Sequence, residues 1–353
     1  MSKATICVVV PVYKAMATLD RCVESVLAQQ VDGGLACILV DDGSPDESGA
    51  MCDAWAAKDD RVTVIHQDDL GVSGARNSGV AAADSEFIVF LDSDDALRPG
   101  ALQAALTAQR AAPQDFVVWH YTTDEHDPAA VTADAALRPQ AGLARLWLDC
   151  LLAMPWNKLY RTDLAKQLPF DVQYTLGEDL QFVLDYIALL GQTAPGFGYR
   201  VLNSPLTFYD CSRGGTLSTR YHANYCDIWP KHFAKLNTAC HTAGCPAEDM
   251  RPLHRAELQV FAEGVADIMR RDPSPTKRLR GYKAEAALRS PWLRALLERM
   301  KIEDCYSAYY LPCRWRNVGL VCRLANARLA DSPLYGKLDW AGYYLLLGRM
   351  RRD

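Results

Sequence analysis

Three aspartates stand within four positions at the end of an apolar run, in IVFLDSDDALRPG at residues 88–100. Such a group of like charges is costly unless a cation lies beside it. Alternate residues of an extended segment face the same way, so Asp92 and Asp94, which flank Ser93, can turn toward one ion. Carboxylate oxygens with no His or Cys nearby favour Mg²⁺ or Mn²⁺. The alternative is an aspartate-rich turn that caps the helix expected after Pro99.

A second candidate is Arg76, in the stretch GVSGARNSG at residues 71–79. A guanidinium held in a fixed place can bind a phosphate or a base carbonyl. The alternative is a solvated arginine near the start of a helix. The glycine spacing is not the GxGxxG of dinucleotide-binding proteins, and the first predicted strand is followed by PVYKAMATL, which has no glycine. The dinucleotide-binding class is therefore excluded.

Two later stretches also carry charge. GED at residues 177–179 places Glu178 and Asp179 at the start of an apolar helix, where the helix dipole favours negative charge, so capping alone explains them. SRGGTLSTR, at residues 212–220, contains Arg213 and can fold over an anion, although a plain surface turn has the same composition. Neither stretch identifies a chemistry by itself.

The elements that must position these residues alternate along the chain. Short apolar runs predict strands at residues 5–13, 36–42, 62–67, 86–92 and 115–121. Helices are predicted between these strands and, later, at residues 154–168 and 177–191. The pattern indicates a mostly parallel sheet covered by helices on both faces. Ligands of such sheets bind at the carboxyl ends of the strands, which places residues 11–13, Asp41 and residues 92–95 along one edge.

Length and charge indicate a domain of about 200 to 250 residues with an appendage. The chain has 353 residues and a formal net charge of -5. Residues 249–353 carry 20 Lys and Arg against 12 Asp and Glu, so the rest of the chain is strongly acidic. An acidic part can hold cations, and a basic part can meet anionic lipid headgroups, although solvated helix faces have the same composition.

The cysteines and the lengths of the apolar runs indicate the cellular compartment of the protein. Twelve scattered cysteines without a CxxC pair predict a reduced, cytoplasmic protein, and the spacing of Cys240, His241 and Cys245 fits no common zinc site. The apolar run at residues 6–12 contains Pro11 and has no cleavage site after it, so it predicts a strand and not a signal peptide. No run approaches the roughly 20 apolar residues of a membrane span, so membrane contact is expected to be peripheral.

Taken together, six stretches resemble the GT-A-fold glycosyltransferases of family 2, especially bacterial enzymes that build capsule, O-antigen and other cell-surface glycans. They are VVVPVYKAMATLDRCVESVLAQ, ILVDDGSPDES, GVSGARNSG, IVFLDSDD, WNKLYR and LGEDLQF, in the family's order over about residues 5–185. The resemblance implies a GT-A fold, with a mostly parallel, Rossmann-like sheet flanked by helices. The pattern along the chain, rather than the resemblance, places a boundary near residues 220–250, so we expect a catalytic domain at residues 1–220 and a helical, basic region at residues 221–353.

The resemblance assigns a role to each matching position. The base and ribose of a nucleotide are expected to contact Pro11, Val12, Tyr13 and Asp41, and Arg76 also contacts the nucleotide. The DxD segment, Asp92 to Asp94 with Ser93 between, binds the ribose and, mainly through Asp94, the Mn²⁺ or Mg²⁺ on the diphosphate. Asp179 matches the catalytic base and Glu178 its acidic neighbour. Arg213, or another loop cation, can stabilise the leaving group.

The expected reaction is an inverting, metal-dependent transfer from a nucleotide-diphosphate sugar, with uridine as the expected base, to a saccharide acceptor. A single carboxylate on the acceptor side argues for one displacement with inversion. A sugar nucleotidyltransferase is an alternative, but it normally opens with a glycine-rich phosphate loop that PVYKAMATL lacks. A non-catalytic glycan- or nucleotide-binding module is a further alternative, which the intact DxD and GED stretches disfavour.

The acceptor and the location are expectations from the family and from the basic C-terminal part. The resemblance implies a lipid-linked saccharide at the inner face of the cell membrane. Residues 312–330 gather Trp315 and Val318 on one predicted helix face, with Arg314, Arg316, Arg323 and Arg328 around it. A helix packed on the catalytic domain has the same pattern. A nucleic-acid partner is not expected.

Overall fold

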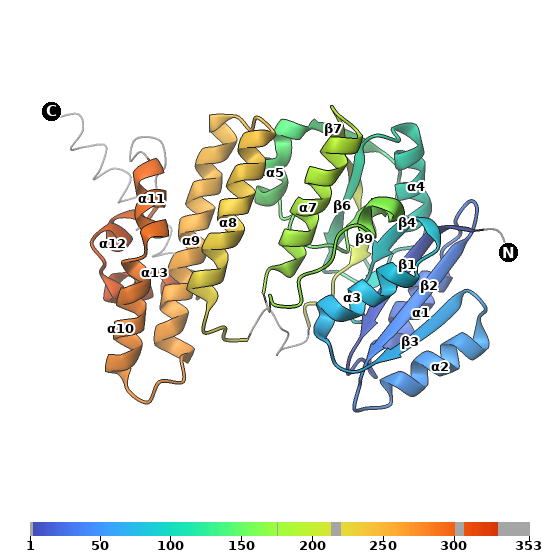
Figure 1. Ribbon diagram of the computed structural model, residues 1–353, viewed down its shortest axis with the longest axis horizontal. Coiled ribbons are helices and arrows are strands. Elements are labelled where there is room, and N and C mark those ends of the chain that lie inside the picture. The colour runs from blue at the N-terminus through green and yellow to red at the C-terminus, as the bar shows by residue number, and fades with distance from the viewer. Residues whose placement is uncertain (1–2, 175, 213–219, 301–306, 331–353) are drawn as a thin grey trace. The chain divides into compact units, whose positions relative to one another are not determined.

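The computed structural model describes residues 3–174, 176–212, 220–300 and 307–330. Its chain divides into two compact units, Met1–Gly214 and Gly215–Asp353. Figure 1 shows the strands in the first unit and a set of helices in the second. Each unit is described here by itself.

The first unit is built on a nine-stranded sheet in the order β3-β2-β1-β4-β8-β6-β9-β5, with β7 paired to β9. The strands are β1 (Ala4–Val12), β2 (Leu35–Asp42), β3 (Val62–Gln67), β4 (Ser85–Phe90), β5 (Ala96–Leu97), β6 (Phe116–Thr122), β7 (Ala135–Pro139), β8 (Lys158–Arg161) and β9 (Gly198–Phe208). Strands β3, β2, β1 and β4 are parallel to one another. The register pairs Val12 with Asp41 and Asp42 with Gln67, so the carboxyl ends of neighbouring strands lie side by side. This edge is the one that the alternating pattern predicts for a ligand.

The other half of the sheet is mixed. Strand β8 runs antiparallel to both β4 and β6, whereas β6 and β9 are parallel. The prediction of a helix at residues 154–168 is therefore wrong for Lys158–Arg161, and only Thr162–Ala165 (α6) is helical. Leu159 and Tyr160 are both buried because β8 lies inside the sheet and is covered on both faces. Pairing with two distant strands overrides the local pattern.

Both faces of the sheet are covered by helices. They are α1 (Leu19–Leu27), α2 (Ser48–Lys58), α3 (Gly71–Ala82), α4 (Ala101–Ala111), α5 (Leu143–Leu148), α6 and α7 (Glu178–Thr193). Residues Ile6, Val8 and Val10 of β1 share a core with α1 and α4, whereas Val9 faces α3. Burial of successive residues explains the unbroken apolar run of β1.

Helix α3 approaches β1 closely at Gly79. A Cβ added at Gly79 would lie 2.2 Å from Cγ1 of Val9, a distance that real Cβ atoms do not show. The helix therefore lies at a fixed separation from the strand, and it carries Arg76 one turn before this contact.

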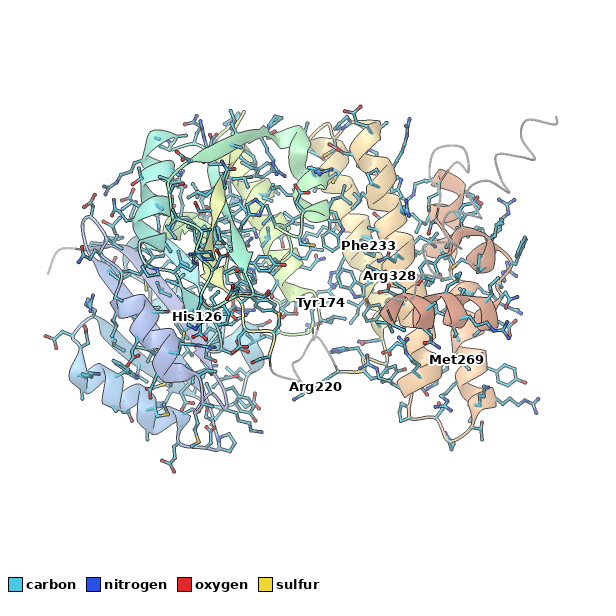
Figure 2. The ribbon with its side chains drawn as sticks, turned by 180° about the vertical axis from the view of Figure 1, so that it is seen from behind. His126, Tyr174, Arg220, Phe233, Met269 and Arg328 are labelled. Atoms are coloured by element: carbon cyan, nitrogen blue, oxygen red, sulfur yellow. The ribbon has the colours of Figure 1, made fainter. Side chains whose placement is uncertain are left out.

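The second unit is helical within its described residues. Its helices are α8 (Tyr225–Thr242), α9 (Ala247–Arg271), α10 (Lys277–Leu288), α11 (Pro291–Arg299), α12 (Tyr310–Arg314) and α13 (Val318–Leu329). Figure 2 labels three residues of its helices, Phe233 on α8, Met269 on α9 and Arg328 on α13. Phe233 is fully buried near Trp292 of α11, and Met269 packs against the core that joins α9 to α13. None of the helices described in either unit is long and apolar enough to cross a bilayer.

Candidate active site

Arg76 joins two carboxylates that are far apart in the sequence. Its Nη1 lies 2.6 Å from Oδ1 of Asp179, and its Nη2 lies 2.8 Å from Oδ1 of Asp92. Asp179 is on the first turn of α7, and Asp92 follows strand β4. Gly177, with a φ of 77°, adopts the left-handed conformation that turns the chain into α7. The structure thus brings Arg76, Asp92 and Asp179 together at the carboxyl edge of the sheet.

Burial and charge act in opposite directions on this group. The Arg76 side chain is 3% exposed, and the surrounding carboxylates hold its pKa above the ordinary value in spite of the desolvation that lowers it. Burial raises the pKa of Asp179 to about 7, while Arg76 lowers it and Glu178 raises it. About a quarter of the Asp179 side chain, 28%, remains exposed. A carboxylate with a pKa near neutrality that solvent can reach is suited to accept a proton.

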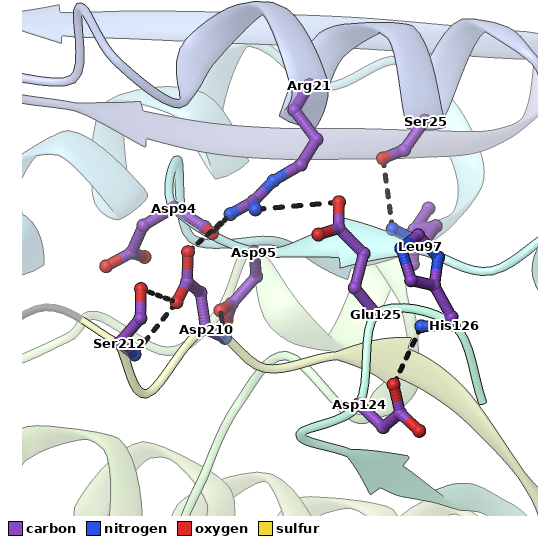
Figure 3. A network of polar contacts seen from close by, with 10 residues as sticks. All are labelled: Arg21, Ser25, Asp94, Asp95, Leu97, Asp124, Glu125, His126, Asp210 and Ser212. Carbon is purple, nitrogen blue, oxygen red and sulfur yellow. Dashed lines mark hydrogen bonds and ion pairs between the residues drawn. The ribbon is translucent and has the colours of Figure 1, made fainter.

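The rest of the aspartate segment is anchored by a network around Arg21 of α1, shown in Figure 3. Nη2 of Arg21 donates to the carbonyl oxygen of Asp94 at 2.6 Å and lies 2.7 Å from Oδ2 of Asp210. The backbone N–H of Asp210 donates to Oδ1 of Asp95 at 3.0 Å. Hydrogen bonds from Ser212, followed by Arg21, lower the pKa of Asp210 to about 2. The segment is therefore held by backbone contacts, which leave the side chain of Asp94 at the half-buried edge.

Asp95, one of the three clustered aspartates, differs from the other two in its burial. It is fully buried, and its Oδ2 has no hydrogen-bond partner among the described residues. Burial and the nearby Asp92 carboxylate raise the pKa of Asp95 to about 9. Asp95 is therefore protonated near neutral pH, chiefly because it is buried.

The donor set at this edge suits a hard divalent cation, because Asp92 and Asp94 offer carboxylate oxygens. Within the part of the chain that the structure describes, no group of three or more His, Cys, Asp and Glu side chains is arranged to hold a metal ion. Two carboxylates fit a cation whose other ligands come from water and from a bound phosphate.

The expected nucleotide positions lie along the same edge. Pro11 and Val12 end β1 and are buried, and Tyr13 is 44% exposed. Asp41, at the end of β2, accepts from the Ser44 N–H at 3.1 Å and lies 3.0 Å from Nδ1 of His66. Burial tends to raise the pKa of Asp41, but these hydrogen bonds outweigh it and lower the pKa.

Ser93 and Glu178 are two further positions that the sequence assigns to the site. Ser93 is half-buried between the two aspartates of the segment, and Glu178 is half-buried beside Asp179. Arg213 lies outside the described residues.

Sequence reasoning missed several residues that shape the site. Arg21, Asp210 and His66 lie in predicted elements or beside a loop, and their own neighbours along the chain give no signal. Lys158, inside the quoted stretch WNKLYR, is fully buried and donates to the carbonyl oxygens of Leu151 and Met154 and to Oδ1 of Asn157. The available signal was a lysine between Trp156 and Leu159, because a lysine buried among apolar residues needs such partners.

Three aromatic rings, those of Tyr121, Trp156 and Tyr209, pack against one another. The Trp156 ring stacks on Tyr209 with 5.3 Å between centroids, and Tyr121 meets both rings edge to face. The acidic residues Asp95, Asp92 and Asp94 contribute to a raised pKa of Tyr209, after burial and Cys211. The aromatic cluster therefore lies on the acidic side of the site.

Comparison with known proteins shows what the first unit is similar to. Residues 7–169 match the model of glycosyl transferase family 2. The chain is 39% identical over 124 residues to glycosyltransferase GlyG of Streptococcus pneumoniae, covering 35% of this chain and 41% of that protein. It is 32% identical over 206 residues to the succinoglycan biosynthesis protein ExoO of Rhizobium meliloti, covering 54% of this chain and 58% of that one. The chain thus spans about half the length of these relatives.

Solved structures share the fold. TarS 1–349 of Staphylococcus aureus, solved in complex with UDP-GlcNAc, has a TM-score of 0.63 and 16% sequence identity. The superposition covers 93% of this chain and 92% of that one. The GT-A fold class predicted from the sequence is confirmed, with the sheet mixed in its second half.

Proposed function

Because residues 7–169 match the model of glycosyl transferase family 2, we propose that the protein transfers a sugar from a nucleotide-diphosphate sugar to a hydroxyl group of a saccharide acceptor. One observation carries this proposal: Arg76 holds Asp179 and Asp92 at the same edge of the sheet, at 2.6 and 2.8 Å. A group able to accept a proton is thereby placed beside the segment suited to a cation and a diphosphate. The proposed catalytic domain is residues 1–220.

The donor side is formed by the ends of the first two strands. We assign the base and ribose to Pro11, Val12, Tyr13 and Asp41, with Arg76 as a further contact. Asp41 is held ionised by Ser44 and His66, so it can accept hydrogen bonds from ribose hydroxyls or from a base N–H. TarS binds UDP-GlcNAc, and this supports a uridine nucleotide here.

Asp92 and Asp94 would hold Mn²⁺ or Mg²⁺, with Ser93 between them at the nucleotide. When bound, the cation would neutralise the charge that develops on the diphosphate as the bond to the sugar breaks. Arg21 fixes the backbone of Asp94, so that the carboxylate keeps its place at the edge. Arg213 is proposed as an additional cation for the leaving group.

Asp179 is proposed as the base on the acceptor side. Its carboxylate takes the proton of the acceptor hydroxyl as that oxygen attacks the anomeric carbon, and Glu178 raises its proton affinity. The attack comes from the face opposite the leaving diphosphate, so the configuration inverts. Arg76 keeps the Asp179 side chain oriented and counteracts the effect of burial on its pKa.

The acceptor is proposed from the relatives. ExoO is a succinoglycan biosynthesis protein, and GgaA of Bacillus subtilis, also similar to this chain, is a minor teichoic acid biosynthesis protein. A saccharide carried by lipid at the inner face of the membrane is the acceptor that this implies, with residues 221–353 serving acceptor or membrane association. Peripheral contact would suffice for that arrangement.

The test is a panel of nucleotide sugars incubated with purified full-length protein and Mn²⁺, with release of the nucleotide diphosphate as the readout. Turnover of one uridine-linked sugar, lost in Asp179→Asn but not in Asp185→Asn on the same helix, is the expected result. Equal turnover in both variants would contradict the assignment of the base. Absence of hydrolysis and transfer for every donor, with donor binding intact, would identify a binding module instead.

A further inference from the structure

The second unit contains a cavity of about 240 Å³ that the transferase site does not use. It lies where the end of α10, the start of α11 and the end of α12 meet, and all of its lining residues belong to the second unit. Leu288, Leu293 and Leu297 form part of its wall. The cavity is thus partly apolar and is formed by three short helices.

The charged lining of this cavity is strongly unbalanced. Arg289, Arg294, Arg314 and Arg316 line it, against one acid, Glu298. Four guanidinium groups around one small cavity repel one another unless an anion lies between them. Their planar donor forks match phosphate oxygens in pairs, so a phosphate group is the anion that best satisfies them.

Two of these four arginines have a partner among the residues that the structure describes. Arg289 pairs with Glu285, and Nη1 of Arg314 donates to the hydroxyl of Tyr310 at 3.2 Å. The guanidinium groups of Arg294 and Arg316 make no ion pair or hydrogen bond with the residues that the structure describes, and both side chains are exposed. They remain available to a ligand.

The backbone at Arg316 gives an independent reason to expect a role for its side chain. Arg316 has a φ of 55° and follows the end of α12, where its N–H donates to Cys313 O and the N–H of Asn317 donates to Pro312 O. This pair of hydrogen bonds is the Schellman arrangement, in which glycine is strongly favoured at the left-handed position. An arginine there is strained, so the chain carries a cation at the cavity where glycine would fit with less strain.

We propose that this cavity is a binding site for a phosphate- or diphosphate-bearing ligand, held by Arg294 and Arg316 with help from Arg289 and Arg314. The exposed ring of Trp315, next to Arg316 in the chain, suits a ligand whose phosphate is attached to a lipid, whereas a soluble diphosphate would use the same cations. The site lies within the second unit, so it does not depend on the transferase activity.

The test uses the full-length protein with EDTA, which prevents metal-dependent binding at the aspartate segment. Pyrophosphate binding is followed by calorimetry for wild type, Arg316→Gly, Arg294→Gln and, as a control in the same unit, Arg323→Gln. Arg323 is exposed and does not line the cavity. We expect about tenfold weaker binding for Arg316→Gly and for Arg294→Gln, and no change for Arg323→Gln. Arg316→Gly should melt at or above the wild-type temperature, because glycine relieves the strain.

A second arm identifies the source of the phosphate. Each protein is sedimented with vesicles of phosphatidylglycerol or of phosphatidylcholine. A selective loss of phosphatidylglycerol binding in the two cavity variants assigns the site to a lipid phosphate, and unchanged vesicle binding with weakened pyrophosphate binding assigns it to a soluble one. Absence of pyrophosphate binding in the wild type, or equal effects of all three substitutions, overturns the proposal, and donor hydrolysis measured in parallel shows that the transferase site is intact.

Discussion

Nη1 of Arg76 lies 2.6 Å from Oδ1 of Asp179, across 103 residues of sequence. The same guanidinium reaches Asp92 through its other nitrogen, so one buried cation links the start of α7 to the end of β4. The proposed base and the proposed cation-binding segment therefore cannot move independently while both ion pairs persist. This coupling is the basis of the first two predictions.

Asp179→Asn should lower the turnover number about 10²- to 10⁴-fold, because an amide cannot take the proton of the acceptor hydroxyl. Donor affinity should change little, since the amide oxygen still accepts from Arg76. Initial rates at saturating donor, together with calorimetric donor binding, measure both quantities. Near-normal transfer would remove Asp179 as the base.

The rate of transfer should rise with pH through about 7, the region in which Asp179 loses its proton. Arg76 lowers the pKa of Asp179, so Arg76→Gln should move the midpoint of the profile to higher pH. Arg76→Lys retains the charge and should move the midpoint less. Rates at saturating donor from pH 5.5 to 9 provide the profile, and Arg61→Gln, which changes an exposed arginine paired with Asp59, should leave it unchanged.

Asp94→Asn should abolish the stabilisation that a uridine nucleotide sugar gives in the presence of Mn²⁺. For the wild type at a donor concentration about 100 times the Kd, binding contributes about 2.7 kcal/mol, which corresponds to a rise of several degrees in Tm. EDTA should remove the rise. As a control, Asp60→Asn, at an exposed aspartate away from residues 92–95, should behave as the wild type. A rise in Tm for Asp94→Asn equal to that of the wild type would contradict the assignment of Asp94 to the cation.

Lys158→Met should destabilise the first unit by about 2 kcal/mol or more, because buried oxygens lose their donor. The ammonium lies 2.7 Å from Leu151 O, 2.5 Å from Met154 O and 2.5 Å from Oδ1 of Asn157. Burial lowers the pKa of Lys158, and these oxygens compensate the charge. Urea denaturation followed by fluorescence tests this, with the exposed Lys166→Met as a control that should be neutral.

Glu257→Gln should make the second unit more stable at alkaline pH. Glu257 is fully buried, its Oε1 accepts from Asn237 at 2.6 Å, and burial raises its pKa to about 8, with the Asn237 hydrogen bond opposing. The folded form therefore binds a proton that the unfolded form releases above about pH 4.5, so stability falls as the pH rises toward about 8. Thermal denaturation should show the fall in the wild type and in the exposed Glu248→Gln, and should show it diminished in Glu257→Gln.

Much of the first unit could be predicted because β1, β2 and β4 are largely buried on both faces and read as unbroken apolar runs. Strand β8 could not be predicted, since the local sequence of Lys158–Arg161 resembles a helical segment. Its strand conformation depends on pairing with β4 and β6 on either side. The edge rule placed Asp41 and Asp92 on one side of the sheet from sequence alone. The ion pairs could not be foreseen, because Arg21 and Asp210 are separated by 189 residues and side-chain pairing at that distance leaves no local pattern.

The close approach of α3 to β1 at Gly79 has a consequence for redesign. Even a methyl group at Gly79 would collide with Val9. The distance between α3 and β1 is therefore fixed, and with it the position of Arg76 one turn earlier. A library of variants intended to change the proposed donor specificity should therefore leave the residues of this helix unchanged. The variable positions belong in the loops after the strands, where the backbone has room to be rebuilt.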